Sequence, residues 1–387
     1  KTTPNVPTLR FSNKTIWEKK RIKDFCEVNP KTEELEDEFI YIDLESVSKG
    51  CLLSKNIISK TNAPGRAQRV LTNNDILFQC VRPYQMNNLL FNAENADFQY
   101  VASTGYAQIR TQENPSFVYH LLHSPNFNKE VMLRCTGSSY PAITSSDLGD
   151  IEVYICGVGE QQKIGHFLDL IDRRIAVQNK IISKYETLIK GIYHEFFSKP
   201  ADYAIKIRDL IIKGKSGGTP SSTVARYYNG DIPFLSISDM TKQGKYVSHT
   251  EKHINESGIE DSSAWIVPSN SLIFSMYASV GLVCINTVPL ATSQAMFSMV
   301  LKDCRMIEYI YYYLNFFRDT KIHRHIETGT QSNINAETVR NIEIPFQSNH
   351  SKLVETINSI EKRLNNEKDM LSLLVDLKAY LLSKLFI

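Results

Sequence analysis

Two long stretches of the chain carry apolar residues at spacings that alternate between four and three. Residues at these spacings line one side of a helix and form the seam of a coiled coil. The first seam includes Ile164, Leu168, Ile171, Ile175, Gln178 and Ile182. The second includes Leu353, Ile357, Ile360, Leu364, Glu367 and Leu371. The spacing therefore predicts two long helices, over residues 159–198 and 348–387.

The two seams match in length and register, and each carries one polar residue at the same level, Gln178 or Glu367. A polar seam residue sets the register of a coiled coil at some cost in stability. We therefore expect the helices to pair with each other. An antiparallel pair would relate the two halves of the chain by a pseudo-twofold axis. The alternative is two independent helices, each docked on its own domain.

Short β-type runs and turns occupy the rest of each half. Runs rich in β-branched and aromatic residues and bounded by turn residues predict strands. Such runs lie at residues 39–44, 75–81, 234–237 and 271–274, and short helical patches lie at residues 117–122 and 307–316. The expected fold class is α+β, with two mixed α/β domains, residues 1–158 and 199–347, separated by the two helices.

The chain contains an internal repeat with a period of about half its length. Residues 39–50 parallel residues 233–244, residues 70–78 parallel 266–274, residues 150–153 parallel 341–344, and residues 160–197 parallel 349–386. The matching segments occur in the same order in both halves. An internal repeat of this kind fixes the architecture before any detail is known, so each half should contain one domain and one helix.

Composition places the chain among ordinary globular proteins. Of the 387 residues, 42% are hydrophobic and 22% are charged, which supplies enough apolar material for real cores. The seven cysteines are odd in number and form no CxxC pair, so we expect a reducing, cytoplasmic compartment and no disulfide framework. We expect no membrane span and no signal peptide. Because residue 1 is Lys, we expect further residues upstream.

The charge is balanced overall but uneven along the chain. The net charge is +2, from 44 basic and 42 acidic residues, so a bulk basic protein that coats nucleic acid is not indicated. Residues 33–38 are almost entirely acidic, whereas residues 206–252 carry twice as many basic as acidic residues. Local patches of this kind matter more than the total charge.

None of the catalytic motifs that this sequence resembles is complete. Gly214-Lys215-Ser216 lacks the upstream glycine that a phosphate-binding loop needs. Asn114-Pro115-Ser116-Phe117 lacks the second proline of an amino-methyltransferase motif, and Gly157 and Gly159 have no glycine counterpart in the second half. We read the segments around residues 155–159 and 345–348 as linkers into the helices. His323 and His325 are spaced poorly for a metal. The sequence therefore predicts no catalytic residue and no metal site.

Several motifs in order give the chain a resemblance to a known family. The most specific stretch is Ser216-Gly-Gly-Thr-Pro220, followed by residues 226–239. Others are Asn74-Asp-Ile-Leu-Phe78, Asn270-Ser-Leu-Ile-Phe274, the glycine segments at residues 136–143 and 328–334, and Glu160-Gln-Gln-Lys-Ile-Gly165. In these motifs and in their duplication, the chain resembles the DNA-specificity subunits of type I restriction–modification enzymes.

The resemblance implies a function that agrees with the repeat. Each of two target recognition domains would read one half of a bipartite, asymmetric target in double-stranded DNA. The antiparallel coiled coil would set the spacer between the halves and scaffold two methylation subunits, and restriction subunits would complete the complex. The chain itself would be no enzyme and would bind no cofactor, while its partners would use S-adenosylmethionine and ATP.

Residues that suit DNA contacts cluster near the strand-like runs and glycine loops. Arg reads guanine, Asn and Gln read adenine, and Lys, Ser and Thr hold phosphates. The candidates in the first half are Arg66, Arg69, Arg82, Tyr84, Gln85, Asn87, Ser138 and Ser139. Those in the second half are Lys215, Thr219, Arg226, Tyr228, Lys242, Lys245, Tyr277, Thr330 and Gln331. The alternative function is a non-catalytic protein–protein scaffold, with two similar binding modules on a coiled-coil strut.

Overall fold

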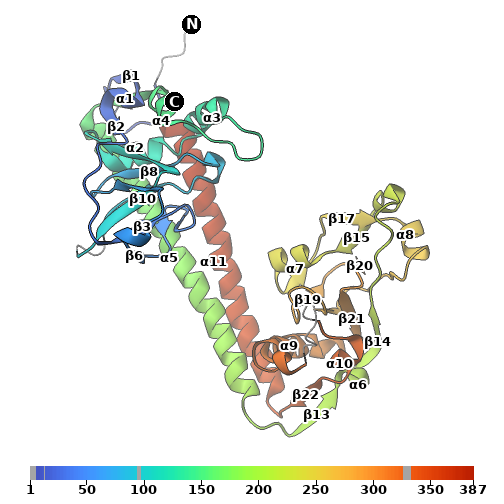
Figure 1. Ribbon diagram of the computed structural model, residues 1–387. Coiled ribbons are helices and arrows are strands. Elements are labelled where there is room, and N and C mark those ends of the chain that lie inside the picture. Colours follow the sequence, from blue (N-terminus) through green and yellow to red (C-terminus); the bar gives the residue numbers. More distant parts are fainter. Residues whose placement is uncertain (1–5, 13, 94–96, 326–332) are drawn as a thin grey trace. The chain divides into compact units, whose positions relative to one another are not determined.

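A computed structural model describes residues 6–12, 14–93, 97–325 and 333–387 of the chain (Figure 1). The chain divides into two compact units. Unit 1 contains residues 1–180 and 367–387, and unit 2 contains residues 181–366. Each long helix therefore contributes one half to each unit.

Unit 1 contains two four-stranded sheets among its described residues, in the orders β6-β3-β10-β7 and β2-β11-β8-β9. Its strands are β1 (Trp17–Arg21), β2 (Cys26–Val28), β3 (Glu38–Ile42), β4 (Val47–Ser48), β5 (Cys51–Leu52), β6 (Asn56–Ser59), β7 (Ala67–Val70), β8 (Ile76–Gln79), β9 (Leu89–Leu90), β10 (Gln99–Ser103), β11 (Tyr106–Thr111) and β12 (Glu152–Cys156). Its helices are α1 (Ile22–Phe25), α2 (Pro115–Leu121), α3 (Pro125–Arg134), α4 (Ser145–Gly149), the first part of α5 (Val158–Phe197) and the last part of α11 (His350–Leu385).

Unit 2 contains a five-stranded sheet, β14-β21-β18-β19-β16, and a three-stranded sheet, β17-β15-β20. Its strands are β13 (Tyr203–Lys206), β14 (Ile211–Ser216), β15 (Ile232–Leu235), β16 (Tyr246–Val247), β17 (Lys252–Ile254), β18 (Leu272–Ser275), β19 (Val283–Asn286), β20 (Ala291–Thr292), β21 (Met296–Leu301) and β22 (Glu343–Phe346). Its helices are the last part of α5, α6 (Ile207–Leu210), α7 (Ile237–Gln243), α8 (Glu256–Glu260), α9 (Ile307–Thr320), α10 (Ala336–Arg340) and the first part of α11.

The two units share one pattern of strand pairing, as the internal repeat predicts. In unit 1, β3 pairs parallel with β10 and β8 pairs antiparallel with β11. In unit 2, β15 pairs parallel with β20 and β18 pairs antiparallel with β21. A two-stranded sheet also precedes each long helix, β1 with β12 and β13 with β22.

Unusual backbone φ angles also recur at matched positions of the two units. Three matched pairs of residues have positive φ, at 78° and 76° for Gly50 and Gly244, 71° and 57° for Asn74 and Asn270, and 55° and 44° for Arg82 and Ala278. Glycine tolerates this conformation, whereas most other residues adopt it only where the surrounding structure requires it. The two halves therefore share an unusual backbone conformation at these positions.

The long helices pair in opposite directions within each unit. In unit 1, Gln178 of α5 donates a hydrogen bond to the backbone oxygen of Glu367 at 3.0 Å, and Asp172 forms an ion pair with Lys378 at 2.5 Å. Residue numbers fall along one helix as they rise along the other, so the pair is antiparallel. In unit 2, the Gln347 side chain donates to the backbone oxygen of Phe196 at 3.0 Å, in the same sense. The prediction of an antiparallel coiled coil is confirmed.

The seam residues are covered along both helices. Ile164, Leu168, Ile171, Gln178, Ile182, Leu353, Ile357 and Leu364 are buried, and Ile175, Ile360, Glu367 and Leu371 are half-buried. In unit 1, residues of α5 join the core of the mixed domain together with Leu381, Leu382 and Leu385 of α11. None of the helices in the described part of the chain is long and apolar enough to cross a membrane.

One predicted strand ends earlier than expected. Residues 234–237 were predicted as one strand, but β15 ends at Leu235 and α7 begins at Ile237. The cause is a capping box, in which the side chains of Ser236 and Asp239 each accept a hydrogen bond from the other's backbone N–H. This local signal overrides the apolar run that precedes it.

Candidate nucleic-acid interface

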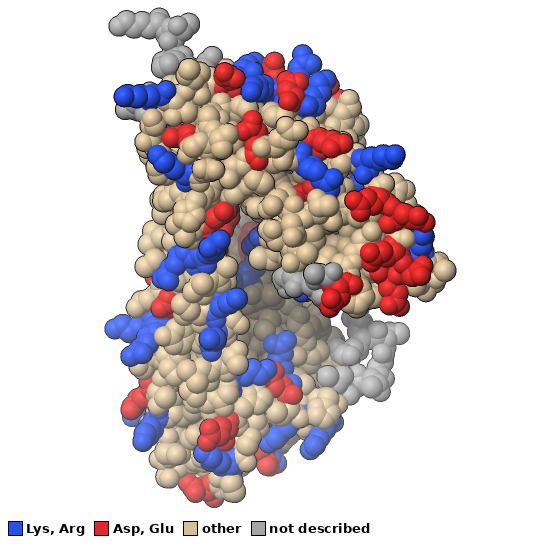
Figure 2. Space-filling model, turned by 90° about the vertical axis from the view of Figure 1, so that its left-hand side faces the viewer, with Lys and Arg blue, Asp and Glu red and all other residues tan. Residues whose placement is uncertain are grey.

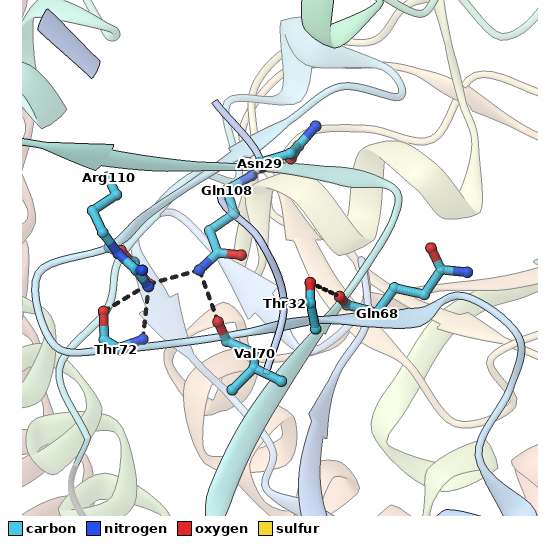
Figure 3. Close-up of polar contacts among 8 residues, drawn as sticks. Asn29, Thr32, Gln68, Val70, Thr72, Gln108 and Arg110 are labelled. Atoms are coloured by element: carbon cyan, nitrogen blue, oxygen red, sulfur yellow. Dashed lines mark hydrogen bonds and ion pairs between the residues drawn. The ribbon is translucent and has the colours of Figure 1, made fainter. Parts of the chain in front are cut away.

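A buried carboxylate organises the centre of unit 1. The Asp75 side chain is 1% exposed and accepts hydrogen bonds at 2.7 Å from the Gln108 amide and at 2.8 Å from two nitrogens of Arg110. Figure 3 labels its partners Gln108, Arg110 and Thr72. It also accepts from the backbone N–H of Thr72 at 2.8 Å. The hydrogen bond to Asp75 raises the pKa of Arg110. Asp75 thus fixes the start of β8 against β11.

A cleft of about 720 Å³ opens beyond the far end of β8. It brings together three of the predicted residues, Arg66, Arg82 and Gln85, with Tyr140 of the first glycine loop. The remaining lining residues are Leu44, Glu45, Gln79, Val81, Thr104 and Gly105. Arg66, Gln85 and Tyr140 are exposed and Arg82 is half-buried, so their polar groups are within reach of a ligand.

Arg82 sits on a tightly held turn. Its backbone has φ 55° and ψ 53°, and it precedes a short 3₁₀ turn at Pro83–Gln85. The Arg82 backbone N–H donates to the Pro141 carbonyl at 2.8 Å, and its guanidinium carbon lies 4.3 Å from the centre of the Tyr140 ring. A cation over an aromatic face is attracted by the ring. The turn and the glycine loop therefore hold each other in place.

Gln79 lies beneath this turn and was missed by the sequence reasoning. Its side chain donates to the Val81 carbonyl at 2.8 Å and to Gln85 Oε1 at 2.9 Å, and accepts from the Asn87 backbone N–H at 3.2 Å. It is 2% exposed. The signal in the sequence is a glutamine that ends an otherwise apolar strand, Ile76-Leu-Phe-Gln79.

The other candidates of unit 1 lie near the cleft or on the loops beside it. Arg69 on β7 is half-buried, and burial lowers the pKa of its guanidinium. Tyr84 is exposed, and Asn87 is half-buried and accepts from the Lys49 backbone N–H. Ser138 and Ser139 are exposed on the glycine loop, which closes through paired backbone hydrogen bonds between Thr136 and Ala142.

The Gly-Gly-Thr-Pro motif of unit 2 is built into the packing of the domain. A Cβ at Gly217 would lie 2.0 Å from the Thr292 carbonyl oxygen, and a Cβ at Gly218 would lie 2.3 Å from the Ala264 backbone nitrogen. Only glycine fits at such distances. Thr219 and Tyr228 follow and line a cleft of about 620 Å³ with Lys252 and His253. The motif therefore positions this cleft through close backbone packing.

The remaining candidates of unit 2 are dispersed. Lys215 on β14 and Arg226 are exposed, and Tyr277 is 40% exposed. Lys242 pairs with Glu251, and this hydrogen bond raises the pKa of Lys242. Thr330 and Gln331 lie outside the described residues.

Lys245 is a correction to the predicted interface. Its ammonium group lies 2.9 Å from Glu308, 2.7 Å from Glu361 and 2.7 Å from the Tyr312 hydroxyl, and the side chain is 10% exposed. Burial alone would raise the pKa of Glu308, but hydrogen bonds from Tyr246, Asn358 and Lys245 lower it. An ammonium group has three donors, and these partners occupy all of them. Lys245 therefore ties the domain to α11 and is unavailable to phosphate.

The charge distribution separates one edge of unit 1 from the cleft. Figure 2 shows acidic side chains gathered on one edge of this unit. The five acidic residues between positions 33 and 38 are all exposed. Such an edge repels phosphate, whereas the cleft carries Arg66 and Arg82.

The described residues hold no group of three or more His, Cys, Asp or Glu side chains that suits a metal ion. All seven cysteines are free, and burial raises the pKa of the Cys26 and Cys156 thiols to about 12. A thiol with so high a pKa is a poor nucleophile near neutral pH.

Comparisons with known proteins point to one family. The model described as "Type I restriction modification DNA specificity domain" matches twice, over residues 15–187 and 202–369. The MjaIX specificity subunit of a type I restriction enzyme of Methanocaldococcus jannaschii is 27% identical over 192 residues, which cover 49% of this chain and 44% of that subunit. The HindI specificity subunit of Haemophilus influenzae is 23% identical over 425 residues, covering 86% of this chain and 92% of that subunit.

The fold is similar to that of a solved structure. The S subunit of a type I restriction–modification system from M. genitalium has a TM-score of 0.57 to this chain, at 17% sequence identity and with 99% of both chains covered. At this identity the likeness concerns the fold alone.

Proposed function

Because the chain belongs to the type I restriction modification DNA specificity family, we propose that it selects the DNA target of a type I restriction–modification complex. It is a non-catalytic specificity subunit with two recognition domains. Unit 1 reads one half of a bipartite target in double-stranded DNA and unit 2 reads the other half.

The observation that supports this proposal is a backbone shared by two domains whose polar side chains differ. The positive φ of Arg82 recurs at Ala278, but the arginine does not. The cleft of unit 1 lies beyond β8, whereas that of unit 2 lies beside β15 and β17. One scaffold with different reading groups suits an asymmetric target, because the side chains that reach base edges determine the sequence that is read.

We propose DNA contacts by all the predicted residues except Lys245. In unit 1 these are Arg66, Arg69, Arg82, Tyr84, Gln85, Asn87, Ser138 and Ser139. In unit 2 they are Lys215, Thr219, Arg226, Tyr228, Lys242 and Tyr277. Thr330 and Gln331 are retained on the sequence alone.

Replacement of one arginine in each unit tests the two-reader assignment. Arg82→Ala should relax reading of one half-site and Arg226→Ala reading of the other, because each guanidinium serves its own domain. A lost base contact costs ~1–3 kcal/mol at one position, whereas a lost phosphate contact weakens all sequences alike. Competition binding with each half-site randomised in turn measures both effects.

Equal loss over both half-sites from either variant would contradict the assignment. A chain that selects no DNA sequence in the presence of its methylation subunits would instead support the protein–protein scaffold. Lys129→Ala, at an exposed residue of α3 outside the cleft of unit 1, is the matched control and should leave both half-sites unchanged.

We propose that the helix pair also binds the methylation subunits, and one flank of it suits this role. Phe167, Leu170 and Val177 of α5 and Met370, Leu373, Leu377 and Tyr380 of α11 are 36–64% exposed. Phe167, Leu170, Val177 and Met370 directly precede seam residues. Leu373, Leu377 and Tyr380 directly precede Leu374, Lys378 and Leu381, which continue the spacing of the second seam. In an antiparallel pair these positions lie on the same side of both helices, so they form one apolar flank within unit 1. Exposed apolar patches of this kind mark interaction sites.

Polar replacement of the flank should release a methylation subunit. We expect Leu373→Gln together with Leu377→Gln to raise the Kd for that subunit roughly tenfold or more, because apolar anchors dominate such interfaces. The fold should persist, since both side chains already face water. Ser372→Gln together with Asp376→Gln, at exposed residues off the flank, is the control. Calorimetric titration measures the Kd, and an unchanged value for the leucine variant would exclude this flank.

The remaining parts of the proposal concern the complex. Two methylation subunits that use S-adenosylmethionine, and restriction subunits that use ATP, would supply the chemistry. The chain would contribute sequence choice and geometry. We propose a cytoplasmic location, because all seven cysteines are free, as expected in a reducing compartment.

A further inference from the structure

We propose that the cleft of unit 1 reads a guanine, and that Gln79 is the positioning residue that makes it do so. The inference rests on the proposed function and adds the base that this domain selects. In the major groove guanine shows two acceptors, N7 and O6, whereas adenine shows an acceptor and a donor. A guanine-reading cleft must therefore present donors.

The orientation of the Gln79 amide is fixed by its neighbours. Its nitrogen faces the Val81 carbonyl, which can only accept, and its oxygen faces the Asn87 backbone N–H, which can only donate. The Gln79 backbone N–H donates to Asn88 Oδ1 at 2.8 Å and closes the same loop. A flipped amide would place oxygen against oxygen and nitrogen against N–H in a buried site, so one orientation is enforced.

This orientation determines what Gln85 can do. The second N–H of the Gln79 amide donates to Gln85 Oε1 at 2.9 Å. The Gln85 oxygen is thereby held toward the protein, and its NH₂ group is left to face outward from an exposed residue. A free glutamine reads adenine by donating to N7 and accepting from N6. With its oxygen engaged, Gln85 offers donors and suits guanine.

The arginines of the cleft reinforce this selection. Arg66 and Arg82 line the same cleft as Gln85, and neither forms an ion pair with any described residue. Both therefore keep their guanidinium donors for a ligand, and Arg82 is held in place by Tyr140. The acidic side chain in the lining is Glu45. A carboxylate accepts from cytosine N4, so Glu45 suits the partner base of a G·C pair.

The internal repeat shows that the guanidinium of Arg82 is not required by the fold. Ala278 occupies the position of Arg82 and also has a positive φ. Unit 2 thus adopts this backbone conformation with a methyl side chain. The backbone conformation is shared by the two units, and the guanidinium of unit 1 is a reading group.

The first test uses the whole complex of this chain with its methylation subunits. Selection from a randomised duplex library gives the bipartite target, and each guanine in it is then replaced by 7-deazaguanine. This analogue removes the N7 acceptor and keeps Watson–Crick pairing. At one guanine of the unit 1 half-site we expect a rise in Kd of roughly 5- to 150-fold, the range of a good bidentate base contact.

The second test changes the positioning residue. Gln79→Glu and Gln79→Met both remove the donor to Gln85, so the Gln85 oxygen becomes free to accept from adenine N6. We expect the preference for guanine over adenine at that position to fall about tenfold, while Gln85→Glu, which removes the donors, should abolish the guanine preference. Gln68→Glu, at an exposed residue of β7 outside the cleft, is the matched control.

Binding to the unit 2 half-site serves as the control for folding in every variant. The substitutions lie in unit 1, so unit 2 should still read its own half-site. A bipartite target with no N7-sensitive guanine in the unit 1 half would overturn this inference and leave the proposed function intact. An unchanged guanine preference in both Gln79 variants, with the unit 2 half still read, would overturn the role of Gln79. A wild-type complex that selects no bipartite sequence would overturn the proposed function itself.

Discussion

Asp75→Ala should destabilise unit 1 by about 3 kcal/mol. The variant removes the acceptor for Arg110, Gln108 and the Thr72 backbone N–H at once. Breaking a buried ion pair by removing one partner costs ~3–5 kcal/mol. We expect the lower end of this range, because Arg110 is 38% exposed and can regain water. The Gln108 amide keeps its second acceptor, the Val70 carbonyl, at 2.8 Å.

Hydrogen exchange shows which strands lose stability in the Asp75→Ala variant. Amide exchange should accelerate over β8 and β11 of unit 1, while the matching strands β18 and β21 of unit 2 should exchange as in the wild type. Glu36→Ala removes an exposed carboxylate of the same unit and should change the free energy of unfolding by less than ~0.5 kcal/mol. Equal effects of the two substitutions would show that Asp75 does not organise the sheet.

Much of the fold follows from the sequence because its signals are periodic and duplicated. The seam residues of α5 and α11 are local and repeat every seven positions, so pairing could be predicted without any knowledge of the domains. The end of β15 could not, because the capping box of Ser236 and Asp239 stops an apolar run that otherwise favours a strand.

The candidate interface was less predictable, because charge alone does not tell whether a side chain is free. Lys245 lies in a basic stretch, but its partner Glu361 is 116 residues away, and only the tertiary fold brings them together. Gln79 was not among the predicted contacts, and only the fold shows its role. Burial beneath the turn keeps Gln79 from reading a base, and its amide instead supports Gln85.

Shortening the helix pair should change the length of the DNA target. We expect deletion of residues 175–181 together with residues 364–370 to shorten the unread spacer between the half-sites by about three base pairs. The two segments lie opposite each other, because Gln178 and Glu367, near their centres, are hydrogen-bonded. Each helix loses one heptad, or ~10.5 Å at ~1.5 Å per residue, and the seams stay in phase.

The half-sites themselves should be unchanged, because no residue of either cleft is removed. The deletion removes Val177 and Met370 of the apolar flank, and the other five flank residues remain to bind the methylation subunits. Methylome sequencing of cells that carry the shortened subunit with its methylation subunits gives both half-sites and the spacer in one measurement. Deletion of residues 175–181 alone is the matched control. It leaves Glu367 without its partner and shifts one seam against the other, so we expect loss of folded protein and no new spacer.

The shortened spacer also turns one half-site around the duplex, and this rotation limits the affinity. Three base pairs of B-DNA correspond to roughly 100° of rotation, so twisting of the DNA must restore the alignment at an elastic cost. We therefore expect weaker binding to the new target than the wild type shows to its own. A folded, active variant that still methylates the wild-type spacer would mean that the helices do not set the distance between the half-sites. The family's two-domain function would survive that result, but the coiled coil would then serve only to bind the methylation subunits.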